Sequence, residues 1–161
     1  MRFLGLSILI LLALSTATTA VHAASQKAAD PVVGFWITEN KEAVVELYQC
    51  YEEICGRFAW FKDEQNGRII RDDNNRDPSK RGRPLCQAQF MGGFVRAKRG
   101  SYPDGWVYNP NDGSTYDVTM TLQNRNTLRV RGYLLVPLLG QSQIWHRAKS
   151  MPPPCTATET P

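Results

Sequence analysis

The sequence is poor in histidine, and this limits the catalytic chemistry open to it. Its two histidines are His22 and His146, and removal of the N-terminal segment described below would leave His146 alone. A serine hydrolase would then need His146 as its base. Ser142, on the same strand face, would lie about 13 Å away at about 3.3 Å per residue. Nothing in the sequence resembles a nucleophile elbow, so we expect a protein that is not an enzyme.

Metal-binding patterns are also missing. The four cysteines are separated by four, thirty and sixty-eight residues, whereas a zinc ribbon needs two short Cys-x-x-Cys pairs. The stretch Asp73-x-Asn75-x-Asp77 opens like a calcium loop. However, Pro78 and Pro84 stand where an EF-hand needs glycine and glutamate. The sequence therefore predicts no metal site and no cofactor.

One apolar run is long, and it lies at the N-terminus. Residues 3–14 are almost wholly apolar, follow Met1-Arg2, and precede a polar stretch and Val21-His22-Ala23. This pattern is typical of a secretory signal peptide, whose apolar part is shorter than the roughly 20 residues of a membrane anchor. We expect residues 1–23 to be removed and residues 24–161 to form one domain that is periplasmic or secreted and not membrane-spanning. We expect no nucleic-acid partner, because export removes the chain from nucleic acid and no recognition module is present.

The cysteines agree with export. Cys50, Cys55, Cys86 and Cys155 all follow the N-terminal segment, and an even number in an exported chain favours two disulfides. Three pairings are possible. Cys50 and Cys55 flank a loop of the length that joins two antiparallel strands, which favours pairing them. Cys86 and Cys155 would then fasten the Pro-rich C-terminal tail to the body.

Short stretches rich in aromatic and β-branched residues, separated by turn signals, fill the sequence after Pro31. In residues 115–123, for example, Tyr116, Val118 and Met120 alternate with polar residues. The strands predicted in this way are residues 32–38, 43–49, 56–62, 85–91, 94–98, 105–108, 115–123, 127–135 and 141–147, with Gly92-Gly93 as a bend. The pattern predicts an all-β fold, a small antiparallel barrel of about eight strands that is filled by side chains or holds one small ligand.

A long polar segment, residues 63–84, interrupts the strands. Such loops are unusual within a compact domain and are often functional or mobile. Arginine forms bidentate contacts with phosphate and carboxylate groups, so a basic loop is a candidate for binding an anionic polymer. The basic residues of the segment are Arg68, Arg71, Arg76, Lys80, Arg81 and Arg83. The acidic residues that offset most of this charge are Asp63, Glu64, Asp72, Asp73 and Asp77.

Several motifs, taken in order, resemble a known family. Gly34-Phe35-Trp36 and Trp145-His146-Arg147 are similar to the G-x-W motif and the C-terminal arginine of lipocalin-like barrels. Further matching pieces are Cys55-Gly56-Arg57 with Trp60, Asp72-x-x-Asn75, Arg81-x-Arg83-Pro84-Leu85-Cys86, Gly93-Phe94, Trp106-x-Tyr108-x-Pro110, Asp112-Gly113-x-x-Tyr116, Leu128-x-Val130-Arg131-Gly132-Tyr133 and Gly140-x-x-x-x-Trp145. Together they resemble the exported bacterial family called domain of unknown function 2147. The chain differs at Arg76, where proline is usual, and at Gln87, where glycine is usual.

The resemblance implies a lipocalin-like barrel outside the cytoplasm, and no activity. It also implies that Arg147 lies across the indole of Trp36 and closes one end of the barrel, with Gly34 and Trp145 as further structural residues. We expect a non-catalytic envelope protein that binds a small apolar or amphipathic molecule. The alternative is an interaction module that binds an anionic envelope polymer or a partner protein through its Arg-rich segment. The sequence does not specify an oligomeric state. The candidate ligand-binding residues are Trp60, Asp72, Asn75, Arg81, Arg83, Trp106, Tyr108 and Tyr116.

Overall fold

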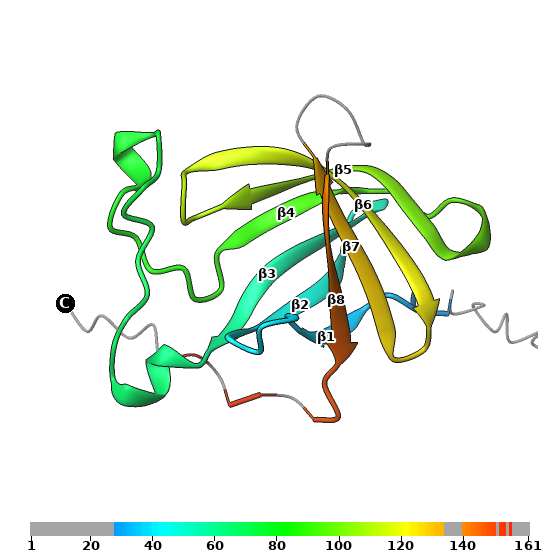
Figure 1. The fold of residues 1–161 in the computed structure, drawn as a ribbon, viewed down its shortest axis with the longest axis horizontal. Helices are drawn as coiled ribbons and strands as arrows, with labels where there is room; N and C mark the ends of the chain where they lie inside the picture. The colour runs from blue at the N-terminus through cyan, green and yellow to red at the C-terminus, as the bar shows by residue number, and fades with distance from the viewer. Residues whose placement is uncertain (1–27, 134–139, 151, 154, 156–161) are drawn as a thin grey trace, which may run out of the picture.

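A closed antiparallel barrel is the architecture of the computed structural model (Figure 1). The structure describes residues 28–133, 140–150, 152, 153 and 155, so the predicted signal peptide, residues 1–23, lies outside the described residues. The strands are β1 (Gly34–Ile37), β2 (Ala43–Cys50), β3 (Glu53–Phe61), β4 (Gln89–Phe94), β5 (Ser101–Asn109), β6 (Ser114–Asn124), β7 (Thr127–Tyr133) and β8 (Gln141–Arg147). Three short 3-10 helices described between them are η1 (Asp63–Asn66), η2 (Pro78–Lys80) and η3 (Lys98–Gly100). Each strand pairs with the next, and β8 pairs with β1, which confirms the predicted fold.

The alternation of residue types along β6 and β7 follows their two faces. Val118 and Met120 are fully buried, whereas Thr119 between them is not. On β7, Leu128 and Val130 are buried and Met120 lies opposite Val130. Apolar side chains that face each other across two strands stabilise the pairing. The period of two therefore identified both strands, although residues 134 and 135 of the second predicted strand lie outside the described residues.

The prediction around Gly92-Gly93 was wrong. These glycines do not separate two strands but lie within β4, where Gly92 pairs with Trp106 of β5. Residues 85–88 and 95–98, predicted as strand, lie outside β4, and β5 begins at Ser101 rather than at Gly105. Glycine inside a strand often marks a place where another group approaches closely. Here the approaching group is the indole of Trp106, from which a Cβ on Gly92 or Gly93 would lie 3.2 or 3.3 Å.

Arg147 closes one end of the barrel. Its guanidinium carbon lies 4.2 Å from the ring centroid of Trp36, which confirms the predicted contact. The guanidinium also donates hydrogen bonds to three backbone carbonyls: Nη2 to Pro31 at 2.6 Å, Nη1 to Val33 at 2.9 Å and Nε to Arg125 at 2.6 Å. A Cβ at position 34 would lie 2.7 Å from Nη1. The glycine of the G-x-W motif therefore makes room for the arginine.

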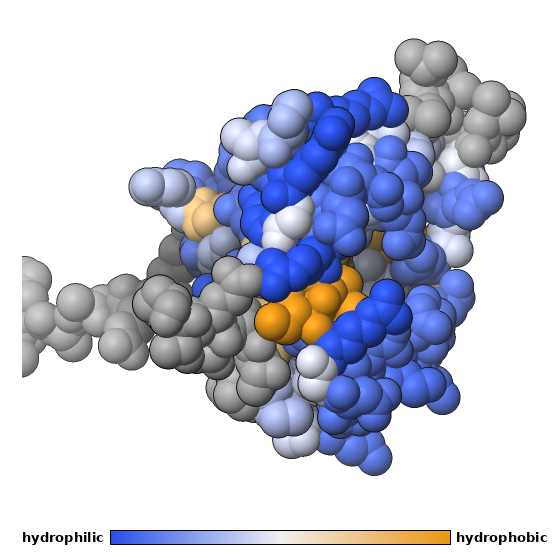
Figure 2. Space-filling view, turned by 90° about the vertical axis from the view of Figure 1, so that its left-hand side faces the viewer, coloured by the Kyte–Doolittle hydropathy of each residue, from blue (hydrophilic) through white to orange (hydrophobic). Residues whose placement is uncertain are grey.

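Segment 63–84 is an ordered flap at one side of the barrel (Figure 1). Arg71 and Pro84 form an isolated β-bridge at its base. At its tip the Asn74 side chain donates hydrogen bonds to the carbonyls of Pro110 and Asn111, in the turn between β5 and β6, at 3.2 and 3.1 Å. A Cβ on Gly113, whose φ is +67°, would lie only 2.0 Å from the carbonyl oxygen of Asn74. Figure 2 shows this side of the molecule, with an apolar patch surrounded by polar surface.

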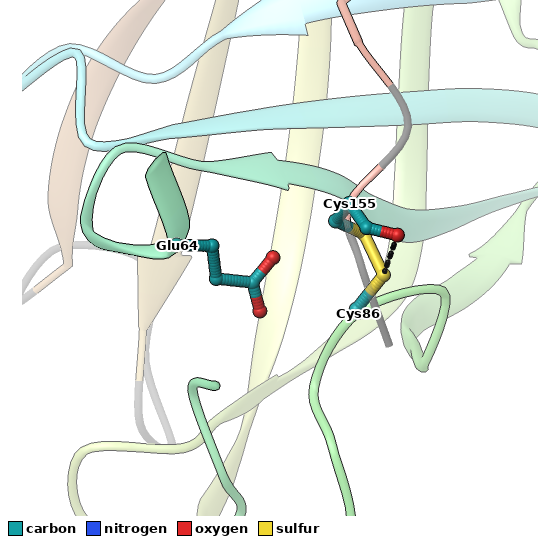
Figure 3. Close-up of side chains that lie close together, drawn as sticks. All are labelled: Glu64, Cys86 and Cys155. Atoms are coloured by element: carbon teal, nitrogen blue, oxygen red, sulfur yellow. Dashed lines mark hydrogen bonds between the residues drawn. A yellow bond between two sulfur atoms is a disulfide. The ribbon is translucent and has the colours of Figure 1, made fainter. Parts of the chain in front are cut away.

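The disulfide Cys86–Cys155 joins the end of this flap to the C-terminal tail, as predicted. Glu64 of η1 lies beside it, and its carboxylate points toward the two sulfur atoms (Figure 3). One carboxylate oxygen of Glu64, Oε2, is buried without a hydrogen-bond partner. A carboxylate and two cysteines within 4.8 Å of one another resemble a metal cluster. Both sulfur atoms are joined in a disulfide, however, so they are not thiolate ligands.

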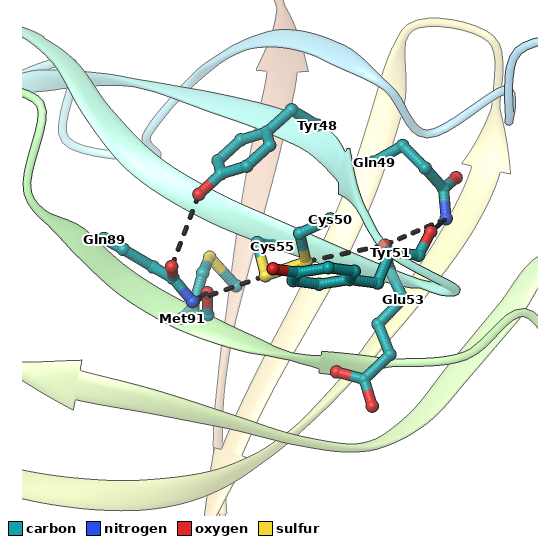
Figure 4. Close-up of a disulfide and its surroundings, with 8 residues drawn as sticks. All are labelled: Tyr48, Gln49, Cys50, Tyr51, Glu53, Cys55, Gln89 and Met91. Carbon is teal, nitrogen blue, oxygen red and sulfur yellow. Dashed lines mark hydrogen bonds between the residues drawn. A yellow bond between two sulfur atoms is a disulfide. The ribbon is translucent and has the colours of Figure 1, made fainter.

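The predicted disulfide Cys50–Cys55 staples the hairpin of β2 and β3 (Figure 4). The turn between the two strands places Tyr51 at a φ of +54° and leaves this residue 98% exposed. Gln49 supports this turn by donating hydrogen bonds to the carbonyls of Tyr51 and Glu53 at 2.9 and 3.0 Å. Both predicted pairings are therefore confirmed.

At position 87 the chain has glutamine where the family that it resembles usually has glycine, and this difference affects the backbone. Gln87 has a φ of +60°, in the left-handed region, where a side chain costs about 1–2 kcal/mol and glycine costs little. Its backbone N–H still donates to the carbonyl of Phe58 at 2.8 Å. We expect Gln87→Gly to raise the free energy of unfolding by about 0.5–1 kcal/mol in urea denaturation, after the greater entropy of glycine in the unfolded chain is subtracted. Gln87→Ala should give no such gain because it retains Cβ, and a destabilised glycine variant would contradict the argument.

Candidate ligand-binding cavity

The end of the barrel opposite Arg147 is open. β1 runs away from the closed end, so Thr38 lies at the other end, and β8 begins there at Gln141. Both residues line a cavity of about 1150 Å³. The other residues around its mouth come from turns and from the flap: Asn40, Glu42, Asp63, Ile70, Arg71, Asp73, Asn74, Asn109, Pro110, Asn111 and Asp112.

The cavity has apolar walls. Phe58 stacks on Phe90 with ring centroids 3.8 Å apart, and it touches Phe61 at 4.8 Å. The further apolar residues that line the cavity are Ala43, Leu85, Val107, Val118, Val130 and Trp145. Residues next to the closed end, such as Leu47 and Met91, are fully buried in the core, as is Val118 of the cavity wall. The cavity therefore lies at the open end of the barrel, and side chains of the core form its inner wall.

Asp72 holds the flap against the barrel. It is fully buried, and its Oδ2 accepts hydrogen bonds from Asn75 Nδ2 at 2.7 Å and from Arg83 Nε at 3.0 Å. Its Oδ1 accepts a hydrogen bond from the hydroxyl of Tyr108 on β5. Burial, and next the hydrogen bond to Asp72, raise the pKa of Tyr108 to about 12. The neutral phenol thus stays a donor to Asp72 over the physiological pH range.

A comparison with protein families agrees with this geometry. The model of the family described as "Uncharacterized protein conserved in bacteria (DUF2147)" matches residues 34–147. The chain belongs to this family. The match begins with β1 and ends with β8, so the DUF2147 region is the barrel itself.

A solved structure supports the fold. The DUF2147 barrel is similar to the structure titled "Protein HP1028 from the human pathogen Helicobacter pylori belongs to the lipocalin family", with a TM-score of 0.65 and 24% sequence identity. The similarity covers 73% of this chain and 82% of that chain. At this identity it shows the fold alone, which is lipocalin-like. No match was found among the curated proteins.

The disulfides of the DUF2147 barrel are consistent with a location outside the cytoplasm. Disulfides persist outside the cytoplasm, and the chain has two of them. Among the described residues, no helix is long and apolar enough to cross a membrane.

The predicted ligand-binding residues fall into three places. Tyr108 and Tyr116 line the cavity, and the hydroxyl of Tyr116 donates to Asp112 Oδ2 at 2.6 Å. Trp60 and Trp106 do not line it. The remaining four belong to the flap network: Asp72, Asn75, Arg81 and Arg83, of which Arg81 donates from Nε to the carbonyl of Asn75 at 2.7 Å. None of these four residues lines the cavity.

Sequence reasoning missed the phenylalanines of the cavity wall. β2 and β3 change register between Val44 and Val45, so that Val44 pairs with Trp60 and Val45 with Phe58. This bulge places both Phe58 and Phe61 at the cavity. A strict alternation would put positions 58 and 60 on one face. No local signal in the sequence marks the bulge.

The basic residues of segment 63–84 do not form one patch. Arg71 lies at the cavity mouth, and Arg68 approaches Asp63 at 4.0 Å. Arg76, Lys80 and Arg83 surround a second hollow on the outside of the barrel. Residues 73–77, which resemble the start of a calcium loop, form hydrogen bonds among themselves: Asn75 Oδ1 accepts one from the Asp77 N–H at 2.9 Å.

The buried carboxyl of Glu64 makes stability depend on pH. Burial raises its pKa, which the hydrogen bond from the Ile70 N–H lowers only in part. The folded state therefore binds this proton more tightly than the unfolded state. Its contribution to stability is largest below the ordinary carboxyl pKa and is lost as the pH rises through the raised value.

We therefore expect Glu64→Gln to be more stable than the parent by about 1 kcal/mol near pH 7, and the difference to vanish near pH 4. Urea denaturation at several pH values measures this difference. Glu52→Gln, at an exposed position, is the control and should give no such pH dependence. An equal effect of Glu64→Gln at both pH values would show that ionisation of Glu64 is not its cause.

Proposed function

We propose that this protein is a non-catalytic binding protein of the cell envelope whose open cavity takes a small amphipathic molecule. The observation that supports this most is the cavity at the open end of the barrel. It has a volume of about 1150 Å³ and is lined by apolar side chains of the barrel, with polar and charged residues at its mouth. A hollow of this kind with a few polar groups at its mouth is the usual form of a small-molecule site.

The ligand's apolar part would lie against the stacked rings of Phe58 and Phe90 and against Trp145. Trp145 can take this position because its Nε1–H is already bonded to Gln143 Oε1 at 2.8 Å. The ligand's polar end would lie at the mouth. The charged residues among the described lining are Glu42, Asp63, Asp73 and Asp112, against the single cation Arg71. The acidic excess favours a neutral or cationic head group over an anionic one.

The fluorescent dye N-phenyl-1-naphthylamine, which is uncharged and apolar, tests the cavity directly. Val107 lines the cavity, so Val107→Trp should fill part of it and weaken dye binding at least tenfold. Val95 is 56% exposed, and the same exchange there, Val95→Trp, is the matched control and should leave dye binding unchanged. Absence of binding to the parent protein, or equal binding by the Val107→Trp variant, would refute the proposal.

Competition for the dye tests the charge of the head group. Decyltrimethylammonium and decanoate carry the same number of carbon atoms in their chains but opposite charges. We expect the cation to displace the dye at a concentration at least several-fold lower than the anion. Stronger displacement by decanoate would overturn the preference for a cationic end while leaving the cavity as the site.

A further inference from the structure

Trp106 presents an indole on the outside of the barrel. It is 38% exposed, whereas Trp36 and Trp145 are buried in the core. A Cβ on Gly92 would lie 3.2 Å from its Cζ2, and one on Gly93 would lie 3.3 Å from its Cδ1. The indole thus lies directly on the backbone of two consecutive glycines, and any side chain there would displace it. The remaining part of its surface faces outward.

A hollow of about 560 Å³ lies in front of this indole. The flap forms one wall and contributes Arg76, Lys80 and Arg83. Gln89 of β4 and Thr115 of β6 add an amide and a hydroxyl from the barrel. Because Asp72 anchors the flap, these cations are held in front of Trp106 by a bonded network.

The charge in this hollow is positive. The cations Arg76, Lys80 and Arg83 face one acidic residue in the described lining, Asp77, which Lys80 approaches at 3.3 Å. Arg83 donates a hydrogen bond from its Nε to the buried Asp72. Arg76 donates to the neutral hydroxyl of Ser114 at 2.8 Å rather than to a carboxylate. An anion that enters the hollow therefore gains contacts with guanidinium groups, which bind phosphate and carboxylate strongly.

We infer that this outer hollow binds an anionic saccharide. The C–H face of a sugar ring carries partial positive charge and matches the negative face of an indole. A phosphate or carboxylate on the same sugar would lie among Arg76, Lys80 and Arg83. The sugar hydroxyls would bond to Gln89 and Thr115. This site is distinct from the cavity of the proposed function: Tyr108 lines both, but Trp106, Arg76 and Lys80 do not line that cavity.

Calorimetric titration with glucose 6-phosphate, glucose, inorganic phosphate and adenosine monophosphate tests the inference. We expect glucose 6-phosphate to bind, and to bind at least tenfold more tightly than glucose or phosphate alone. Trp106→Ala and Arg76→Gln should each weaken this binding at least tenfold. Trp60→Ala is the matched control, because Trp60 lines neither hollow, and it should have no effect.

Each other outcome would overturn the inference. Absence of glucose 6-phosphate binding, or equal binding by the Trp106→Ala variant, would show that the indole is not part of a saccharide site. Equal affinity for inorganic phosphate would reduce the site to a simple anion contact. Tighter binding of adenosine monophosphate would assign the indole to a base rather than to a sugar. N-phenyl-1-naphthylamine binding should stay unchanged in all these variants, so this test and the cavity test fail independently.

Discussion

Replacement of Arg147 by alanine should lower the free energy of unfolding by about 3 kcal/mol, one of the two largest effects expected for a single residue in this barrel. The substitution removes the cation above Trp36 and leaves the carbonyls of Pro31, Val33 and Arg125 without their donor. Burial lowers the pKa of the guanidinium, but an arginine remains charged. Chemical denaturation followed by tryptophan fluorescence measures the loss.

Two further variants separate the causes of this loss. Arg147→Lys keeps the positive charge but not the planar group that reaches three carbonyls, so it should recover less than half of the loss. Arg129→Ala is the control for removing an arginine, because Arg129 is exposed and bonds Ser142 on the outside of β8. Full recovery by lysine, or a loss below about 1 kcal/mol in the alanine variant, would contradict the assigned role.

Replacement of Asp72 by alanine should cost about 3–4 kcal/mol, since it removes one partner of a buried ionic network. Arg83, Asn75 and Tyr108 would lose their shared acceptor. Asp72→Asn should cost less, about 1–2 kcal/mol, because an amide oxygen still accepts from Arg83 and Asn75 while its nitrogen donates to the Tyr108 oxygen. Urea denaturation of both variants measures this order.

The same substitution should loosen the cavity mouth. Ile70 and Leu85 line the cavity and flank the bonded part of the flap, so the Asp72→Ala variant should bind N-phenyl-1-naphthylamine more weakly and be cut by proteases within residues 63–84. The neighbouring Asp73→Ala variant is the control, because Asp73 is exposed. If Asp73→Ala matched Asp72→Ala in stability and in cleavage, the network around Asp72 would not be what holds the flap.

Asp72 also explains why ligand residues were hard to recognise from the sequence. Asp72, Asn75 and Arg83 are polar and lie in a long loop, which is typical of residues that bind ligands. The fold instead buries Asp72 completely and uses all three residues to hold one another. Arg83 also lines the outer hollow beside Trp106, where the flap places Arg76 and Lys80 as well.

The order of residue types along the chain predicted most of the strands and favoured the disulfide pairs that form, and the resemblance to lipocalin-like barrels implied the stacking of Arg147 on Trp36. Alternation of apolar residues is a local property, and a hairpin fixes which cysteines can meet. Only the tertiary structure decided which aromatic residues face the cavity, because one bulge in β3 turned Phe58 and Phe61 inward. It likewise decided that Gly92 and Gly93 support an indole instead of bending the chain. Both outcomes depend on register and on contacts between distant segments, which no local pattern in the sequence specifies.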